Sequence, residues 1–427
     1  MKKLLIIILI TPLFVFSQKQ EKCGNQHHFE KNTHFKQATN KTLNNIYNIT
    51  KTKKQSDTIL RIPVVVHVVY ENITENISDN IILSQINALN RDFRRQNSDT
   101  TNTRIEFDTI AADTKIEFFL ATTDPFGQPT TGITRTPTTE NSFIDLTFNL
   151  DKVKSASTGG KDAWPVEDYL NIWVCDLSIS LFGTSAPFVL GFAYPPVGVS
   201  NWPPGSTPTN PMFDGVVVHY EVFGENNPLS TLNFGGTTIY ADKGRVCVHE
   251  VGHYLGLRHI WGDGDCTEDD GITDTPRSDS QADFQCDFTK NTCVDVPYNF
   301  PDMIENYMDY SEEECQNMFT KGQKDIMRTT LETVRLPLVL LNTSTTNLEE
   351  TKNNIKVFPN PTTRFVNIDS NQKIEKIEIY TTKGKKILEQ KNNSQKTTID
   401  FNQKEKGLYF LKITNKNQTK TFKQIIN

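Results

Sequence analysis

The stretch that decides the fold lies in the middle of the chain and reads His249-Glu250-Val251-Gly252-His253-Tyr254-Leu255-Gly256-Leu257-Arg258-His259. Residues 245–257 lack proline and carry a helical pattern, so His249 and His253 are expected one turn apart on the same helix face. Both imidazoles can therefore bind one metal ion. On a straight helix His259 would lie roughly 9 Å further along, out of reach. We expect Gly256 to end the helix, because glycine tolerates the positive φ that lets His259 turn back.

Three neutral imidazoles beside a carboxylate predict a catalytic zinc centre. Three histidines leave the fourth position of Zn²⁺ open for water, whereas structural zinc sites are closed by four protein ligands. Glu250 follows the first histidine, where it can take a proton from that water and pass it to a leaving amine. A structural zinc site would leave Glu250 without a role. The motif therefore predicts metal-assisted hydrolysis, and hydrolysis of a non-peptide amide fits the same chemistry.

The whole motif resembles the long zinc-binding motif of the metzincin metallopeptidases, and Asn306-Tyr307-Met308-Asp309-Tyr310 looks like their Met-turn. With the acidic loop after the histidines and Asp274-Thr275-Pro276, the segment 57–340 resembles the pappalysin family in its bacterial ulilysin-like branch. The resemblance implies an α+β fold, with a twisted mixed sheet, an active-site helix and a Met-turn. It also implies that Met308 lies beneath the metal and that Tyr310 hydrogen-bonds the tetrahedral intermediate. Simple packing is the alternative role for Tyr310.

The chain has seven cysteines, and the last four follow the histidine motif. In an exported protein disulfides are permissible, and spacing alone allows three pairings of these four. The family pairs its cysteines in an interlaced way, which maps here to Cys266 with Cys293 and Cys286 with Cys315. Cys175 and Cys247 either pair across a sheet–helix interface or remain buried thiols.

The resemblance also implies a calcium site and a charged specificity pocket. The loop 263–274 holds six carboxylates in twelve residues, a density that repels itself unless a hard cation bridges it. Family members bind Ca²⁺ there, and the expected ligands are Asp270, Asp274 and the Thr275 carbonyl, with a merely solvated loop as the alternative. Ulilysin-like enzymes cut before basic residues because an acidic side chain lines the pocket. The matching position is Glu313, which predicts Arg or Lys on the primed side.

The N-terminal residues predict export and latency. Residues 1–18 combine two lysines, an apolar run of about 13 residues and a small residue, which is typical of a signal peptide and short of the ~20 residues that span a bilayer. We expect a secreted protein, extracellular or at the cell surface, without a transmembrane anchor. Residues 19–56 show little apolar periodicity and are interpreted as a pro-segment. Within it, Cys23-Gly24 resembles the cysteine switch of this branch, in which a thiolate occupies the open zinc position.

The folded body is expected at residues 57–341. A dense β-branched run at 62–70 predicts a buried strand, and the segment 78–95 predicts an amphipathic helix that begins at a serine. Further strands are expected at 116–121, 170–177 and 214–222. His67 and His219 lie in valine-rich strand patterns, so we expect both to be structural.

A linker at 342–353 precedes a C-terminal module at 354–427. Short alternating strands at 355–358, 365–368, 374–380, 386–388 and 408–414 predict a small β-sandwich. Residues 351–427 hold 16 Lys and Arg against 6 Asp and Glu in a chain of net charge −6. The basic residues alternate with apolar ones and lack an aromatic stacking pattern, which favours solvated strand faces and argues against nucleic acid as a partner.

Two stretches of this module, Val357-Phe358-Pro359-Asn360-Pro361 and Gly407-Leu408-Tyr409-Phe410-Leu411-Lys412, resemble the sorting domain of the bacterial type IX secretion system. The resemblance implies that secretion machinery as a partner, with an accessory carbohydrate- or protein-binding domain as the alternative. The sequence as a whole predicts a zinc metalloendopeptidase, made as a latent zymogen, that acts as a monomer on proteins or peptides. The rival hypothesis is an inactive surface adhesion protein that uses the same metal-bound fold.

Overall fold

The computed structural model describes residues 22–24, 33–52, 57–144, 149–181, 184–196, 210–234, 237–294, 298–340, 355–381, 385–402, 404–415 and 419–427. The chain forms two compact units that divide between Ser344 and Thr345. The predicted signal peptide at 1–18 and the predicted linker at 342–353 lie outside the described residues. Among the described helices, none has both the length and the apolar character needed to cross a bilayer.

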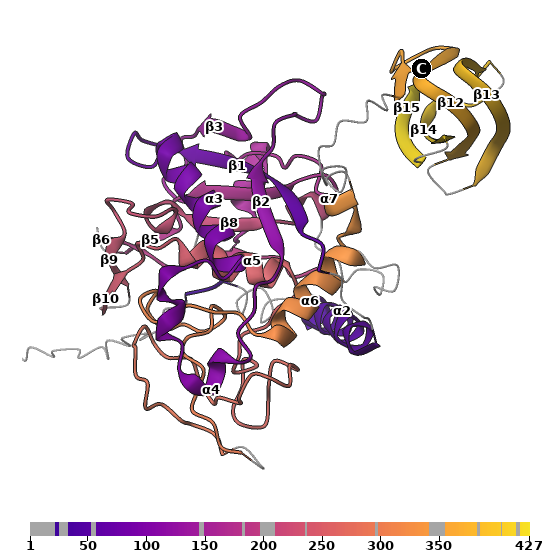
Figure 1. The fold of residues 1–427 in the computed structure, drawn as a ribbon. Coiled ribbons are helices and arrows are strands. Elements are labelled where there is room, and N and C mark those ends of the chain that lie inside the picture. Colours follow the sequence, from indigo (N-terminus) through magenta and orange to yellow (C-terminus); the bar gives the residue numbers. More distant parts are fainter. Residues whose placement is uncertain are drawn as a thin grey trace, which may run out of the picture. The chain divides into compact units, whose positions relative to one another are not determined.

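A six-stranded sheet organises the first unit (Figure 1). Its central strand, β1 (Leu60–Tyr70), pairs in parallel with β2 (Ile116–Leu120), β3 (Ile133–Pro137) and β4 (Leu170–Cys175). The predicted strands that begin at residues 62, 116 and 170 are thus confirmed. β3 was not predicted, because its five partly exposed residues carry too little alternation to indicate a strand.

The far edge of the sheet lies next to the histidine motif. β4 pairs in parallel with β8 (Val216–His219), which the prediction over 214–222 contains, and β8 pairs in the antiparallel direction with β7 (Gly191–Ala193). β7 is the edge strand and contacts α5 (Arg245–Tyr254). Three residues are too few for a periodic pattern, so this strand was not predicted.

The sequence of β1 reflects burial on both of its faces. Val64, Val66 and Val68 belong to the larger core, whereas Val69 belongs to a smaller core on the opposite face. Because side chains alternate along a strand, a run of β-branched residues is what two covered faces require. His67, on the same strand, is fully buried. Its Nδ1 lies 2.7 Å from the Thr134 hydroxyl oxygen, and its Nε2 lies 2.9 Å from the Asn171 side-chain oxygen. His219 is likewise buried, and its Nδ1 accepts from a backbone N–H.

Helices pack on the larger core. α3 (Asp79–Phe93) begins where predicted, at Ser78, whose hydroxyl accepts from the Ile81 N–H. α3 packs against α5, and α6 (Lys321–Glu332) is followed by α7 (Leu336–Leu340). α2 (Thr33–Thr52) lies against α6 (Figure 1). α2 corrects the expectation that the pro-segment lacks apolar periodicity.

The apolar face of α2 is short. Leu43, Ile46 and Tyr47 are buried at helical spacing, but they stand among polar residues that hide the pattern.

The remaining elements of the unit are shorter. They are α4 (Ile105–Asp108), β5 (Ser178–Leu181), β6 (Thr184–Pro187), β9 (Thr231–Phe234), β10 (Thr237–Tyr240) and the 3₁₀ turns η1 (Ser98–Asn102), η2 (Lys152–Lys154), η3 (Ala156–Thr158), η4 (Pro211–Phe213) and η5 (Tyr220–Val222).

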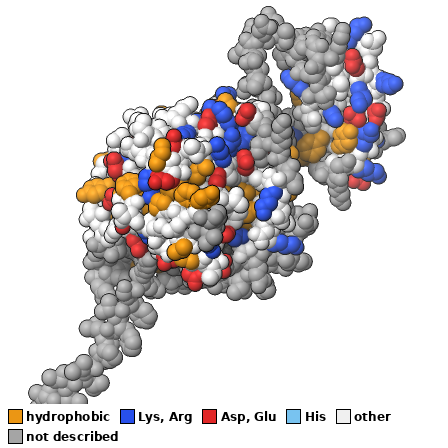
Figure 2. Space-filling view, turned by 60° about the horizontal axis from the view of Figure 1, so that its bottom comes forward, with side chains coloured by type: hydrophobic (Ala, Val, Ile, Leu, Met, Phe, Trp, Pro, Cys, Tyr) orange, Lys and Arg blue, Asp and Glu red, His pale blue; other side chains and the backbone are white. Residues whose placement is uncertain are grey.

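The C-terminal unit is an antiparallel β-structure with its own core. Its strands are β11 (Ile355–Phe358), β12 (Phe365–Thr381), β13 (Lys386–Asp400), β14 (Gly407–Asn415) and β15 (Thr419–Ile426). The expected small β-unit is therefore present, although one curled sheet supplies both layers of the predicted sandwich (Figure 1). The predicted strands at 365–368 and 374–380 form the single long strand β12. Its pairing with β13 shifts in register between Asp369 and Ile374. Figure 2 shows basic and acidic side chains next to each other on the surface of this unit.

Candidate metal centre and active-site cleft

α5 carries the histidine motif, and a buried carboxylate holds its first turn. Every residue of α5 is buried. The first N–H groups of a helix lack partners within the helix, and the Glu313 carboxylate accepts three hydrogen bonds here. The donors are the backbone N–H groups of Lys243, Arg245 and Val246, at 2.6, 2.7 and 2.9 Å. The Arg245 side chain is also buried and pairs with Asp92 at 3.3 Å. α5 is thus anchored at the end that precedes the histidines.

A tight turn after α5 returns the chain toward the helix. Gly256 has φ of 97°, in the left-handed region that favours glycine. A Cβ at this position would lie 2.8 Å from the Thr330 hydroxyl, so side-chain space is lacking as well. The Leu257 N–H donates to the Gly252 carbonyl at 3.0 Å and closes the turn. The structure thereby brings His259 against the two helical histidines.

The three histidines present the same ring nitrogen to one point. The Nε2 atom of His253 lies 3.1 Å from that of His249 and 3.0 Å from that of His259. Each Nδ1 contacts an oxygen that can accept its proton. These oxygens are the Tyr307 carbonyl at 2.7 Å, the Leu257 carbonyl at 2.9 Å and the Asp263 carboxylate at 2.5 Å. With Nδ1 protonated, three Nε2 lone pairs face one another, an arrangement that a metal cation stabilises. The residues fit a zinc ion.

Burial keeps the imidazoles of His249 and His253 in the neutral form that binds metals. It lowers the pKa of His249 well below the ordinary value, and the neighbouring histidines add to this effect. Burial and the proximity of His259 lower the pKa of His253 to about 3. Both rings are therefore neutral at neutral pH, with the proton on Nδ1, so metal binding does not have to displace a proton from Nε2.

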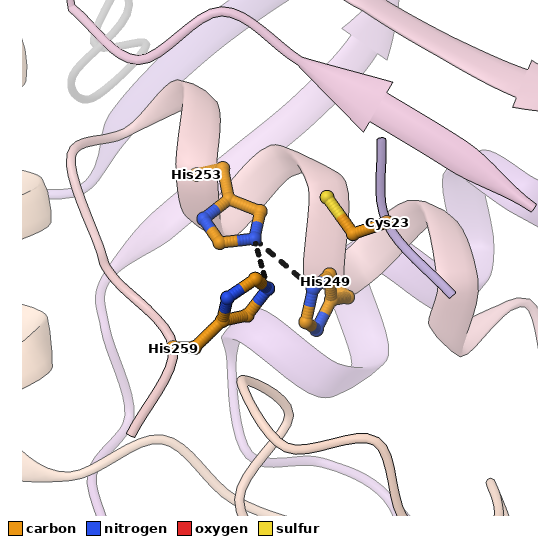
Figure 3. Close-up of side chains that lie close together, drawn as sticks. All are labelled: Cys23, His249, His253 and His259. Carbon is orange, nitrogen blue, oxygen red and sulfur yellow. Dashed lines mark hydrogen bonds between the residues drawn. The ribbon is translucent and has the colours of Figure 1, made fainter. Parts of the chain in front are cut away.

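Cys23 is the fourth group at this point (Figure 3). Its sulfur and one nitrogen of each histidine all lie within 4.8 Å of one another. Cys23 forms a parallel bridge with Gly191, and the Gly24 N–H donates to the Gly191 carbonyl at 2.8 Å. Residues 22–24, which lie in the predicted pro-segment, thus extend the sheet at β7 and direct the thiol toward the histidines.

Glu250 is fully buried beside that thiol. The Cys23 Sγ donates to Oε2 of Glu250 at 3.3 Å, while Oε1 has no hydrogen-bond partner among the described residues. Burial raises the pKa of Glu250 to about 8, against the opposing effects of Cys23 and Lys22. A Cβ on Gly191 would lie 2.8 Å from the Glu250 side chain, so glycine lets β7 approach this closely. A carboxyl group in this setting can both accept and release a proton near neutral pH.

The Met-turn residues lie on two sides of the histidines. Met308 packs under α5, where a Cβ on Gly252 would lie only 2.4 Å from the methionine sulfur. The Tyr310 ring lies 5.5 Å from that of His249 and 5.0 Å from that of His259. The Tyr310 hydroxyl accepts from the Cys23 N–H at 3.1 Å. Tyr310 therefore faces the group that occupies the cleft, as a residue that contacts substrate would.

Two neighbours of His259 were missed by the sequence-based reasoning. The Trp261 ring stacks on the His259 ring with centroids 4.3 Å apart and planes at 5°. Asp263 accepts from the outer nitrogen of the same histidine. A metal-binding histidine usually donates its second N–H to a carboxylate or carbonyl, so an aspartate four residues after His259 was the available signal.

Both expected disulfides are present, linking Cys266 with Cys293 and Cys286 with Cys315. Cys175 and Cys247 are not bonded to each other. Cys175 lies in the smaller core and Cys247 in the larger one, so the sheet separates the two thiols. The alternative of two buried thiols is the one observed.

The acidic loop is partly engaged in the protein's own hydrogen bonds. Both Asp274 oxygens accept from the start of α6, from the Thr320 hydroxyl at 2.7 Å and the Gly322 N–H at 2.8 Å. Asp270 is buried, and its Oδ1 accepts from the Thr275 hydroxyl at 2.7 Å. Its Oδ2 has no partner among the described residues, and burial raises the pKa of this carboxyl to about 8. The calcium ligands therefore stay a prediction.

Glu313 lines a small pocket beside the metal centre. Other lining residues are Lys22, Ile239, Phe284 and Ser311. Glu313 therefore lines a pocket and also accepts hydrogen bonds from the start of α5. The second role cannot be recognised from its position in the sequence.

Two family models match the chain. One, described as pregnancy-associated plasma protein-A, matches residues 220–332, and another, described as a secretion system C-terminal sorting domain, matches residues 356–427. An extracellular metalloprotease of Arthroderma otae is 41% identical over 90 residues, which are 21% of this chain and 32% of that relative. The chain spans about a third of the length of this curated relative.

Solved structures match a larger part of the chain. Mature mirolysin of Tannerella forsythia, in complex with a cleaved peptide, is 42% identical with a TM-score of 0.56, covering 67% of this chain and 97% of that one. A mutant of Tannerella forsythia promirolysin is 37% identical with a TM-score of 0.61, covering 76% and 98%. Both matches take in almost the full length of the compared structure.

Proposed function

Because the chain belongs to the pregnancy-associated plasma protein-A family, the pappalysins, we propose that it is a secreted zinc endopeptidase made as a latent precursor. One observation carries the proposal: three histidines and the Glu250 carboxyl group converge on a single buried point, where the Cys23 thiol lies. Metal-assisted hydrolysis of a peptide bond needs a metal site with a proton acceptor beside it.

The mechanism follows from what surrounds this point. Bound there, Zn²⁺ would act as a Lewis acid and lower the pKa of a water molecule. Glu250 would take the proton of that water and deliver it to the departing amine, a transfer suited to a carboxyl group with a raised pKa. The Tyr310 hydroxyl, which meets the Cys23 N–H in the latent form, would donate to the oxygen that becomes negative in the tetrahedral intermediate. Met308 would support the histidines from below.

Latency follows from the position of residues 22–24. They occupy the edge of β7, where an extended substrate would add as a strand, and they place a thiol at the histidines. As long as Cys23 remains there, neither water nor substrate reaches Glu250. Removal of the pro-segment would clear the edge strand, the histidines and Tyr310 together.

Cleavage before Arg or Lys is proposed on the basis of Glu313. Its buried carboxylate lines the pocket beside the metal centre and is held in place by three backbone N–H groups. A carboxylate in the wall of a small pocket favours a basic side chain there. A calcium site in the acidic loop is also proposed, supported by the unpartnered Oδ2 of the buried Asp270.

Export by the type IX machinery is proposed for the whole protein, with residues 356–427 as the signal. This unit has its own core, so it can fold and act separately from the first unit. The proposed destination is the cell surface or the medium.

The decisive experiment is to incubate the zinc-loaded protein, freed of its pro-segment, with a peptide library and read the products by mass spectrometry. We expect cleavage that stops with a chelator, returns with zinc and places Arg or Lys after the cut. Apolar residues after the cut would contradict the role of Glu313. Absence of any cleavage would favour an adhesion protein on the same fold.

Glu250→Gln separates the enzyme from that rival. An enzyme should lose proteolysis by about 10²–10⁴-fold, because general base catalysis is worth that much, while its zinc content stays at one ion per chain. The control is Glu375→Gln in the C-terminal unit, which should leave activity unchanged. Equal activity of the Glu250→Gln variant and the parent protein would contradict the mechanism.

A further inference from the structure

Lys22, the residue before the cysteine, lies in an unusual position for a lysine. Its side chain is 1% exposed, and its ammonium has no hydrogen-bond partner among the described residues. A buried charge without a partner is strongly unfavourable, so a lysine reaches such a place only where opposite charge surrounds it. Neither the histidine cluster nor the thiol explains this side chain.

The pocket that receives Lys22 is the one that Glu313 lines. The carboxylates of Glu313, Asp309 and Glu250 are the charges that favour the Lys22 ammonium, while burial opposes it and lowers the pKa of the lysine. The walls are apolar, with Ile239 on β10 among them. An apolar wall that leads to a carboxylate suits the stem and the head of a lysine.

Lys22 and Glu313 both line this pocket, and little free space is left beside the lysine side chain. The remaining cavity measures about 10 Å³, close to the space that one water molecule needs. One water between Lys22 and Glu313 would complete the contact. No room remains for a second side chain, so a substrate side chain can enter only after Lys22 has left.

The backbone around Lys22 is also held. The Lys22 carbonyl accepts from the Leu190 N–H at 3.0 Å and from the Gly191 N–H at 3.4 Å. One residue later, the Cys23 thiol meets Glu250. A single short stretch on β7 thus sends one side chain to the metal centre and the previous one to the adjoining pocket.

We propose that Lys22 is a built-in substitute for the substrate's basic side chain, so that the pro-segment is held by two contacts, a thiol at the histidines and an ammonium in the Glu313 pocket. The inference rests on the proposed function, because it treats this pocket as the one that reads the substrate. Lys22 thus adds a second contact that holds the pro-segment, besides that of Cys23. Because Lys22 itself occupies the pocket, the pocket is expected to bind a long basic side chain of the substrate.

The test measures how well Cys23 is shielded, using the full-length, zinc-loaded chain with Glu250→Gln to prevent self-cleavage. The rate of Cys23 alkylation by iodoacetamide is followed by peptide mass mapping, with the buried Cys175 and Cys247 as internal controls for unfolding. Lys22→Met keeps the length of the side chain and removes its charge. We expect it to speed alkylation of Cys23 by roughly 10- to 100-fold, the worth of a buried charged contact.

Two variants act as controls. Lys22→Arg retains the charge and should stay within about threefold of the parent rate. Lys41→Met removes an exposed charge of the same pro-segment and should have no effect. An unchanged rate in Lys22→Met would overturn the proposal, as would equal acceleration by Lys41→Met.

A second arm uses the mature protein and two short peptides, Glu-Lys-Cys-Gly and Glu-Met-Cys-Gly. Calorimetry should show the lysine peptide binding at least about tenfold more tightly, and equal binding would overturn the proposal. Neither arm needs turnover. If the peptide library is not cleaved but Lys22→Met exposes Cys23, the proposed function fails and the contact of Lys22 with the pocket stands. If the library is cleaved but Lys22→Met does not expose Cys23, only the proposed role of Lys22 fails.

Discussion

One ion pair from each unit shows how differently a charged pair can be placed. In the first unit, Arg245 pairs with Asp92 at side-chain exposures of 1% and 0%, at the start of the helix that carries the histidines. In the C-terminal unit, Arg364 pairs with Asp400 at exposures of 49% and 44%. Burying an ion pair is costly, so a buried pair is expected where the positions of side chains have to be specified. An exposed pair contributes little to stability and mainly keeps the surface hydrated. The contrast separates a unit built to hold a reactive site from one built around an exposed sheet.

Arg245→Met should produce the largest effect. It removes the cation that faces Asp92 and Asp99 and the donor to the Glu313 carbonyl. We expect the first unit to lose about 3 kcal/mol of unfolding free energy or more, because the buried carboxylate loses a partner. Urea unfolding of the full chain, followed by hydrogen exchange in α5, measures it. A loss below 1 kcal/mol would mean that depth does not distinguish the two units.

Asp263→Asn should weaken zinc binding by roughly 10- to 100-fold without unfolding the protein, because a neutral amide orients and polarises the His259 ring less well. Competition with a chromophoric chelator gives the affinity. The matched control is Asp265→Asn, whose side chain hydrogen-bonds, within the described part of the chain, to the nearby Thr267 alone. If both variants bind zinc equally well, the carboxylate at 263 has no positioning role.

Gly252→Ala tests how tightly the floor of the site is packed. The added methyl would lie 2.4 Å from the Met308 sulfur, and overpacking of this kind costs about 1–3 kcal/mol, partly offset by the helix preference of alanine. Thermal unfolding measures the loss. A double variant with Met308→Ala makes room for the methyl, so the two losses should sum to more than the loss in the double variant.

Arg364→Met should have the smallest effect, a change in the stability of the C-terminal unit near the limit of measurement, because the pair it breaks is exposed and screened by salt. Unfolding is followed by hydrogen exchange in β12 and β13. A loss as large as that of Arg245→Met would refute the comparison between the units.

The parts of the site that could be predicted are those whose spacing is local. His249 and His253 are four residues apart on a helix without proline, and Gly256 lies where the chain has to turn, so elementary helix geometry places all three. β1 was recognisable because both of its faces are buried, and α3 because its apolar stripe is long. β7 and α2 were missed, since three residues and a three-residue apolar face carry too little periodicity.

The sequence by itself determined the chemistry: the metal-binding residues, the proton acceptor beside them and the cysteine at the other end of the chain are all readable as residue types at given spacings. Only the tertiary structure decided that Glu313 holds the start of α5, that Asp263 orients His259, and that Lys22 enters the pocket next to the metal centre. Each of these contacts except that of Asp263 joins residues far apart in the chain, and their approach depends on how the sheet, α5 and the Met-turn pack together. The spacing of residues along the chain does not predict such packing, because the packing depends on contacts throughout the core.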